Sequence, residues 1–115
     1  MKNNETKRFL ESNFDGKVKC APENDGKYQN WIIKSDQSHI FVNLINVATG
    51  QYLNCSSSGQ ISTLKLNDTE NQKWVIRNQK IVNLATNEVL GLNSSRNICA
   101  AELNAEENCQ IWDQI

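Results

Sequence analysis

The chain has 115 residues and a formal net charge of −1, which leaves room for one domain, spanning residues 1–115, and predicts no nucleic-acid partner. Its apolar runs are far shorter than the roughly 20 residues of a membrane helix, so no membrane insertion is predicted. The polar N-terminal residues contain no apolar stretch of a secretory signal, which predicts a cytoplasmic protein and leaves non-classical release open.

Short predicted strands follow one another along the chain. In chain order they cover residues 9–10, 17–20, 31–33, 41–46, 52–53, 61–66, 74–76 and 98–101. Between them, clusters rich in Asn, Asp, Ser and Gly favour tight turns, at residues 13–16, 23–26, 56–59 and 94–97. No segment shows a helical period, so the predicted fold class is all-β.

The tripeptide Gln-x-Trp occurs three times and uses all three tryptophans, which are Trp31, Trp74 and Trp112. The tryptophans lie 43 and 38 residues apart, an interval typical of an internal repeat. In each case a leucine lies 21 or 22 residues before the tryptophan, at Leu10, Leu53 and Leu90. The chain is therefore predicted to consist of three repeats, at approximately residues 1–38, 39–78 and 79–115.

Further positions match when they are counted from these leucines. The sixth residue after the leucine is Gly16, Gly59 or Arg96, and the fourteenth is Asn24, Asn67 or Asn104. A similar segment precedes each leucine, at residues 2–7, 45–50 and 82–87. Three copies of one unit thus fill the chain.

Each repeat holds about four predicted strands, which gives about twelve short strands in all. A four-stranded unit cannot bury its own apolar face, so the three units must close around a common core. A β-trefoil with pseudo-threefold symmetry meets this requirement, whereas a propeller needs more blades and a sandwich explains no threefold period. The Gln and Trp of each motif share one side of a strand, so we expect three buried indoles and glutamines that hydrogen-bond a neighbouring turn.

The four cysteines occupy four different positions of the repeat, at Cys20, Cys55, Cys99 and Cys109. Disulfides that belonged to the repeat would recur at matching positions, and the predicted compartment is reducing, so free thiols are expected. There is no Cys-x-x-Cys pair, and His39 is the only histidine, which argues against a zinc site. No metal and no other cofactor is predicted.

Gln-x-Trp repeats of about 40 residues resemble those of the ricin-B-type β-trefoil lectins. Within that family the chain is most similar to actinohivin-type lectins, small three-repeat proteins for high-mannose glycans. The similarity covers the whole chain and is sharpest in the first repeat, at residues 8–18, 24 and 28–31. It implies one shallow sugar site in each repeat. There an acid after the leucine accepts hydrogen bonds from vicinal hydroxyls, an Asn adds a donor and an acceptor, and aromatic rings cover the sugar face.

Carried over to the first repeat, the resemblance implies sugar contacts by Glu11, Asn24 and Tyr28, with Lys19 at a second aromatic position and Ala21 at an apolar one. Each residue also has a plainer interpretation. Asn24 favours a turn in any protein, Glu11 could be a solvated surface acid, and Tyr28 could pack under the turn. Lys19 could pair with Glu11 and close the site.

The other two repeats depart further from the family pattern. In the second repeat the acid position holds Asn54 and the aromatic positions hold Ser62 and Asn71, while Leu64 and Asn67 keep the pattern. In the third repeat the acid position is Gly91 and an aromatic position is Cys99, which leaves mainly Asn104. The sites are therefore expected to be uneven, with the first best and the third degenerate.

The function predicted from the resemblance is that of a non-enzymatic lectin for mannose-type or related neutral glycans, with glycans or glycoproteins as partners. One shallow site binds weakly, so a multivalent glycan or a homo-oligomer would supply avidity. The alternative is a trefoil that has lost sugar binding and serves as a protein-interaction or inhibitor module. An enzyme is disfavoured, because one histidine and no Gly-x-Ser-x-Gly motif or phosphate loop leave no set of catalytic groups.

Overall fold

The computed structural model describes residues 1–24, 26–103 and 108–113, and within them it contains only strands and single 3₁₀ turns. The twelve strands are β1 (Lys2–Asn3), β2 (Phe9–Ser12), β3 (Val18–Ala21), β4 (Trp31–Ser35), β5 (Val42–Asn46), β6 (Tyr52–Cys55), β7 (Ile61–Leu64), β8 (Trp74–Arg77), β9 (Lys80–Asn83), β10 (Val89–Leu92), β11 (Ile98–Ala101) and β12 (Trp112–Asp113). A 3₁₀ turn precedes the last strand of each repeat, namely η1 (Lys27–Gln29), η2 (Glu70–Gln72) and η3 (Asn108–Gln110). The prediction of an all-β chain is confirmed.

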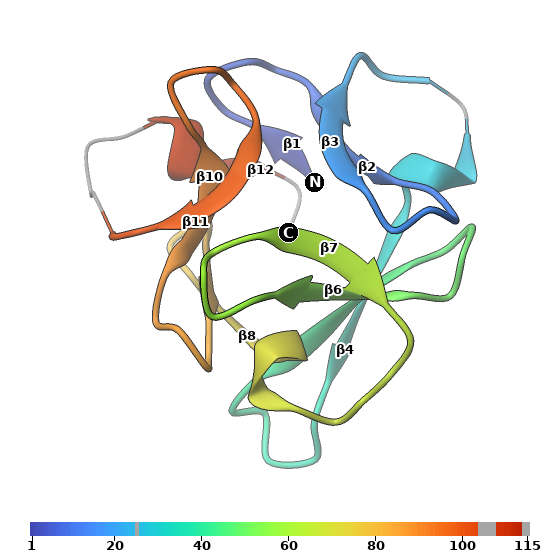
Figure 1. Ribbon diagram of the computed structural model, residues 1–115, viewed down its shortest axis with the longest axis vertical. Coiled ribbons are helices and arrows are strands. Elements are labelled where there is room, and N and C mark those ends of the chain that lie inside the picture. Colours follow the sequence, from blue (N-terminus) through green and yellow to red (C-terminus); the bar gives the residue numbers. More distant parts are fainter. Residues whose placement is uncertain (25, 104–107, 114–115) are drawn as a thin grey trace.

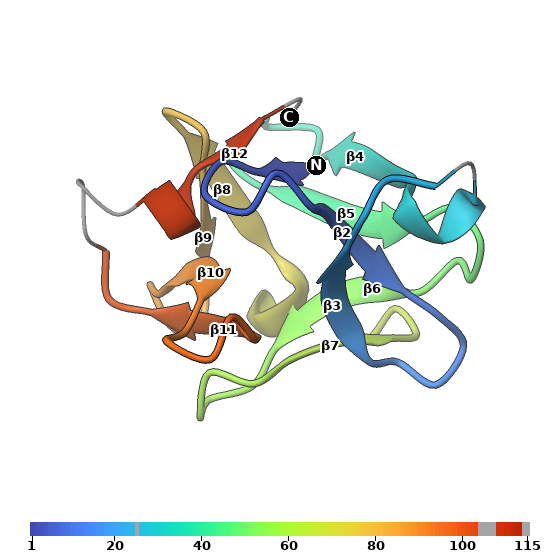
Figure 2. The same cartoon turned by 90° about the horizontal axis from the view of Figure 1, so that it is seen from above.

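Three hairpins with the same register lie around the centre of the molecule (Figure 1). The hairpin β2–β3 pairs Phe9 with Ala21 through to Ser12 with Val18, and β6–β7 and β10–β11 form equivalent ladders. The hairpins contact one another through β3, β7 and β11. Among the remaining strands, β1 pairs with β12, β5 with both β4 and β8, and β8 with β9 (Figure 2). The strands β1, β5 and β9 also pair with β2, β6 and β10, which joins them to the three hairpins. This arrangement is the predicted β-trefoil.

The core is built on one contact that occurs in each repeat. The indole nitrogens of Trp31, Trp74 and Trp112 donate to the carbonyls of Leu10, Leu53 and Leu90, at 2.9, 3.0 and 3.0 Å respectively. The three leucines are fully buried. Burying the large indoles supplies much of the hydrophobic stabilisation, and each indole N–H has the partner that a buried polar group requires.

The expected burial of all three indoles is wrong for Trp31. Trp74 and Trp112 are fully buried, but Trp31 is only half-buried. Trp31 begins β4, a strand that pairs with β5 alone in the described part of the chain. The other four residues of β4 are exposed, so this part of the trefoil covers its tryptophan less completely.

The side chains of the motif glutamines form hydrogen bonds with backbone groups of the turn that precedes them. The side-chain amides of Gln29, Gln72 and Gln110 each donate at 2.8 Å to the carbonyl of Pro22, Lys65 and Glu102 respectively. In the first two repeats the side-chain oxygen also accepts, at 3.0 Å, from the backbone amide of Asn24 and of Asn67. Asn104, at the matching position of the third repeat, lies outside the described residues.

Buried asparagines join each repeat to the one before it. The side-chain amides of Asn3, Asn46 and Asn83 donate to the carbonyls of Cys109, Tyr28 and Asn71, at 2.8, 2.8 and 3.0 Å. Each of these carbonyls belongs to the residue before a motif glutamine, so the contact fixes the 3₁₀ turn of a neighbouring repeat. The asparagine oxygens accept backbone amides of their own turns. All three asparagines are fully buried, and their hydrogen bonds offset the cost of burying polar groups.

Candidate functional site

A carboxylate in the first repeat collects several donors at the surface. Glu11 lies in β2, and its Oε1 accepts from the side-chain amides of Asn24 at 3.3 Å and Gln29 at 3.1 Å. Its Oε2 lies 3.6 Å from the Lys19 ammonium, across the strand pair β2–β3. The Glu11 side chain is 15% exposed and that of Lys19 is 67% exposed. The carboxylate is therefore held in a fixed place, while Lys19 is free to swing into solvent.

Asn24 serves both the turn and this cluster. Its backbone amide donates to Gln29 and its side-chain oxygen accepts from the Gly26 amide at 2.8 Å, which orients the side chain. The side-chain nitrogen reaches Glu11. The two interpretations of Asn24 from the sequence, a turn residue and a site residue, are thus compatible.

Two aromatic rings lie on the surface beside the cluster. Tyr28, in η1, is 40% exposed and meets Phe14 edge-on, with ring centroids 6.2 Å apart and ring planes at 83°. Phe14 is 66% exposed in the turn after β2, and it was not among the residues predicted from the sequence. The available signal was a large aromatic residue in the otherwise polar turn at residues 13–16. Exposed aromatic rings next to a fixed carboxylate can cover the apolar face of a sugar ring.

In the second repeat the equivalent polar groups are occupied by the protein itself. Asn54 is buried on β6, opposite Ser62 on β7. The Asn71 side chain donates to the Cys55 carbonyl at 2.7 Å. The Asn67 side-chain oxygen accepts from the amide and the hydroxyl of Thr69. The exposed Leu64 remains on the surface, so this repeat offers less polar chemistry than the first.

In the third repeat the acid position is closed by packing. A Cβ atom on Gly91 would lie 3.0 Å from the side chain of Gln110 and 3.1 Å from the carbonyl of Cys109. An acidic side chain there would displace the motif glutamine. Cys99 pairs opposite Gly91, and burial, followed by the nearby Glu88 carboxylate, raises the pKa of its thiol.

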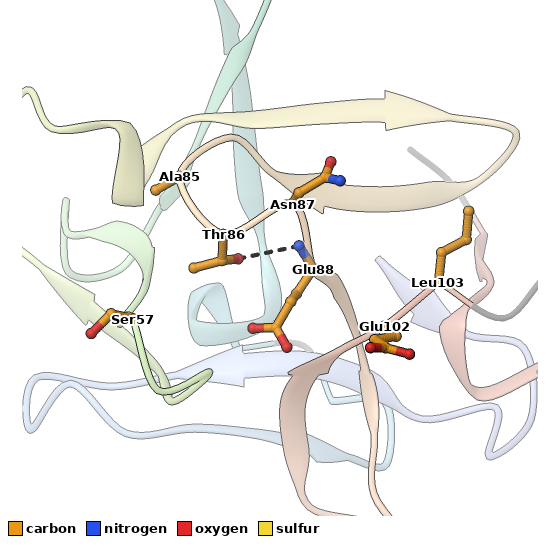
Figure 3. A pocket seen from close by; sticks show the side chains of 7 residues that line it. All are labelled: Ser57, Ala85, Thr86, Asn87, Glu88, Glu102 and Leu103. Atoms are coloured by element: carbon orange, nitrogen blue, oxygen red, sulfur yellow. Dashed lines mark hydrogen bonds between the residues drawn. The ribbon is translucent and has the colours of Figure 1, made fainter.

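A separate cavity of about 620 Å³ lies between the second and third repeats (Figure 3). It is lined by Ser57, Ala85, Thr86, Asn87, Glu88, Glu102 and Leu103. None of these side chains is aromatic, and Thr86 is already bonded to the Glu88 amide at 3.2 Å. Among the described residues no His, Cys, Asp and Glu side chains gather in a group that could hold a metal ion. Within the same residues no helix is long and apolar enough to cross a membrane.

The twelve strands in three similar repeats define the class of this protein as a β-trefoil domain. Residues 27–112 match the family model described as ricin-type beta-trefoil lectin domain-like, and the chain belongs to this family. No curated protein matches the sequence significantly.

Solved structures share the fold at low sequence identity. The designed three-fold symmetric protein ThreeFoil superposes with a TM-score of 0.84 at 18% identity, covering 96% of this chain and 92% of ThreeFoil. A GlcNAcα1-4Gal-releasing endo-β-galactosidase from Clostridium perfringens gives a TM-score of 0.85 at 19% identity, over 96% of this chain but only 30% of the enzyme. The Polyporus squamosus lectin, bound to Neu5Acα2-6Galβ1-4GlcNAc, gives a TM-score of 0.76 at 17% identity, over 90% of this chain and 42% of the lectin. The chain thus spans under a third of that enzyme, and these likenesses concern the fold.

Proposed function

We propose that this protein is a non-enzymatic lectin that binds neutral, mannose-type glycans through its first repeat. The observation that carries the proposal is the Glu11 carboxylate, which the side-chain amides of Asn24 and Gln29 hold near the exposed rings of Tyr28 and Phe14. Membership of a lectin-like family supports carbohydrate binding in general. The mannose preference rests on the sequence resemblance in the first repeat.

The chemistry follows from the arrangement of the polar groups. Two adjacent hydroxyls of a sugar donate to the two oxygens of Glu11, and one of these oxygens is freed when the exposed Lys19 moves aside. Asn24 supplies a further donor at the rim, and a pyranose face packs on Tyr28 or Phe14. Such a shallow site binds weakly, so avidity through a multivalent glycan or through self-association completes the proposed function.

A second candidate function, binding to another protein, is favoured by one observation. The exposed isoleucines Ile32 and Ile33 lie on β4, and Ile40 is exposed in the loop that joins β4 to β5. Several large apolar side chains exposed on one strand and its adjoining loop are a feature of interaction surfaces. This candidate predicts a binding partner that neither Glu11 nor Tyr28 contacts.

Titration of ¹⁵N-labelled protein with a mannose oligosaccharide tests the lectin proposal. We expect amide shifts centred on Glu11, Asn24 and Tyr28, and roughly tenfold or greater loss of affinity in Glu11→Ala, because a charged acceptor is lost. Glu5→Ala, which removes an exposed acid in another turn, is the matched control. Shifts confined to the second or third repeat would refute the assigned site. If no glycan on a densely coated array binds the protein, the lectin proposal fails and the protein-binding candidate replaces it.

A further inference from the structure

The contacts between the three central hairpins are not equal. The carbonyl of Gly16 accepts from the Thr63 amide at 2.9 Å, and the carbonyl of Gly59 accepts from the Ala100 amide at 3.1 Å. These bonds join the first repeat to the second and the second to the third. The equivalent groups between the third and first repeats are the Arg96 carbonyl and the Cys20 amide, and in the described part of the chain they are not hydrogen-bonded to each other.

The residue at the hairpin turn explains this difference. Gly16, Gly59 and Arg96 all have positive φ, at 80°, 85° and 63°. A Cβ atom on Gly16 would lie 2.9 Å from the Thr63 carbonyl, and one on Gly59 would lie 3.0 Å from the Ala100 carbonyl. Arg96 has that Cβ atom. Since such an approach is too close for a real side chain, the third hairpin cannot close on the first as the others close on their neighbours.

A cavity of about 570 Å³ lies at this open junction, between β3 and the β10–β11 turn. Its lining includes four cationic side chains, which are Arg8, Lys17, Lys19 and Arg96. No carboxylate is among the described residues that line it. The cations come from three separate segments, with Arg8 before β2, Lys17 and Lys19 at β3, and Arg96 in the turn between β10 and β11 (Figure 1 labels these strands), which is why the sequence showed no basic patch.

Little in the protein balances these charges. The Lys19 ammonium lies 3.6 Å from the Glu11 carboxylate, and the Asp15 carboxylate accepts a hydrogen bond from the backbone amide of Lys17. Among the described residues the side chains of Arg8, Lys17 and Arg96 make no ion pair. Like charges that face one cavity raise its electrostatic potential, and an anion that enters the cavity relieves the repulsion.

We propose that this cavity binds the anionic group, a carboxylate or a sulfate ester, of an acidic glycan whose neutral ring occupies the site at Glu11. The glycan part of this inference rests on the proposed function, and the anion site rests on the cavity itself. Lys19 connects the two, because its ammonium lines the cavity and lies 3.6 Å from the Glu11 carboxylate. A compact anion fits better than a long polyanion, since the cations surround one cavity and the net charge of the chain is −1.

Five probes test the proposal by titration of ¹⁵N-labelled protein: methyl α-mannoside, its 6-sulfate, 3′-sialyllactose, inorganic sulfate and a short single-stranded DNA. We expect at least one acidic sugar to move the amides of Lys17, Cys20 and Ile98 as well as those near Glu11. The neutral sugar should move only the amides near Glu11. Added NaCl should weaken binding of the acidic sugar more than binding of the neutral sugar, because the salt screens the charges.

Substitutions at Arg96 separate charge from shape. Arg96→Lys keeps a cation and a Cβ atom and should bind the acidic sugar almost normally, whereas Arg96→Gln should lose roughly tenfold in affinity. Arg96→Gly should let the third hairpin close on the first, so that the carbonyl at position 96 accepts from the Cys20 amide and the hydrogen exchange of that amide slows. The same change should abolish the response of the cavity amides to the acidic sugar. Lys34→Gln, which removes an exposed cation on β4, is the control and should bind normally.

Each contrary result has a definite meaning. Unchanged binding of the acidic sugar in both Arg96→Gln and Arg96→Gly would overturn the proposed site. A response at these amides to inorganic sulfate but to neither acidic sugar would overturn the glycan assignment, even if methyl α-mannoside still binds near Glu11. If the protein binds no neutral sugar but an acidic sugar still moves the amides at the cavity, the proposed function is refuted and the anion site is retained. A short single-stranded DNA that binds the cavity more tightly than either acidic sugar would replace the glycan by nucleic acid.

Discussion

The side-chain amide of Gln29 donates both to the Pro22 carbonyl, at 2.8 Å, and to the Glu11 carboxylate, at 3.1 Å. A residue of the core motif thus also supports the surface cluster. In the other repeats the glutamine makes the same kind of bond to the turn, but Asn54 and Gly91 stand in place of the acid. The first repeat therefore differs from the others in the connection between its core and its surface.

Replacing the motif glutamines should separate these two roles. Gln29→Leu and Gln72→Leu each leave a turn amide and a turn carbonyl unpaired, so each should lower the free energy of unfolding by about 1–3 kcal/mol. Only Gln29→Leu should also weaken glycan binding, because only Gln29 supports Glu11. Urea unfolding and glycan titration of both variants provide the measurement. Equal loss of binding in the two variants would contradict the role assigned to Gln29.

The buried asparagines should be critical to stability. Asn83→Ala removes a donor to the Asn71 carbonyl of the second repeat and an acceptor for the amides of Ala85 and Thr86 in its own turn. We expect a loss of about 3 kcal/mol or more in the free energy of unfolding, since several buried polar groups lose their partners. Asn87→Ala, at an exposed position of the same turn, should cost much less, and the difference in urea midpoint reports the result. A loss no larger in Asn83→Ala than in Asn87→Ala would show that these bonds contribute little.

The fold could be predicted because its evidence is periodic. Tryptophans at a near-constant interval, each after a leucine at a constant distance, required three similar units, and the structure shows the same Trp–Leu hydrogen bond in each of them. The burial of Trp31 could not be predicted in the same way. It depends on how completely the neighbouring strands cover β4, and the repeat pattern treats all three tryptophans alike.

The candidate site was predictable where its residues lie within one repeat. Glu11, Asn24 and Lys19 come together because β2, β3 and the following turn are local structure. The cationic cavity brings Arg8 together with Arg96, which the sequence separates by most of the chain. One local signal did exist, namely the departure from glycine at position 96, but its consequence required the distances across the hairpin junction.

The thiols should be free and unreactive in the folded protein. Burial raises the pKa of the Cys20 thiol to about 12, and burial also raises the pKa values of Cys55 and Cys99. At a given pH, Cys20 therefore has roughly a thousandfold less reactive thiolate than an ordinary cysteine. Alkylation at pH 8 should be slow in the native protein, whereas the unfolded chain should titrate four thiols. A count of two or none would contradict free thiols.

The raised pKa of Cys20 also predicts how stability depends on pH. Its contribution is fully present below the unfolded pKa near 9 and is lost as pH rises toward the folded pKa of about 12, because the unfolded chain releases the proton first. The free energy of unfolding should therefore fall over this range, and it should fall less steeply in Cys20→Ala. Urea unfolding at several alkaline pH values measures both slopes. Equal slopes in the native protein and the variant would refute the assignment.

The closed acid position of the third repeat should resist any attempt to restore a site there. In Gly91→Asp the new Cβ would press on Gln110 and on the Cys109 carbonyl, so we expect a loss of about 1–3 kcal/mol in the free energy of unfolding and no new glycan response. Gly50→Asn is the matched control, because nothing lies within 4 Å of a Cβ there and Asn87 holds the equivalent position at a φ of 58°. That control should cost about 1 kcal/mol or less, because Asn is one of the few residues besides Gly that adopt a positive φ. If Gly91→Asp is as stable as Gly50→Asn and gains glycan-induced shifts in the third repeat, the packing of Gln110 against Gly91 does not close this position.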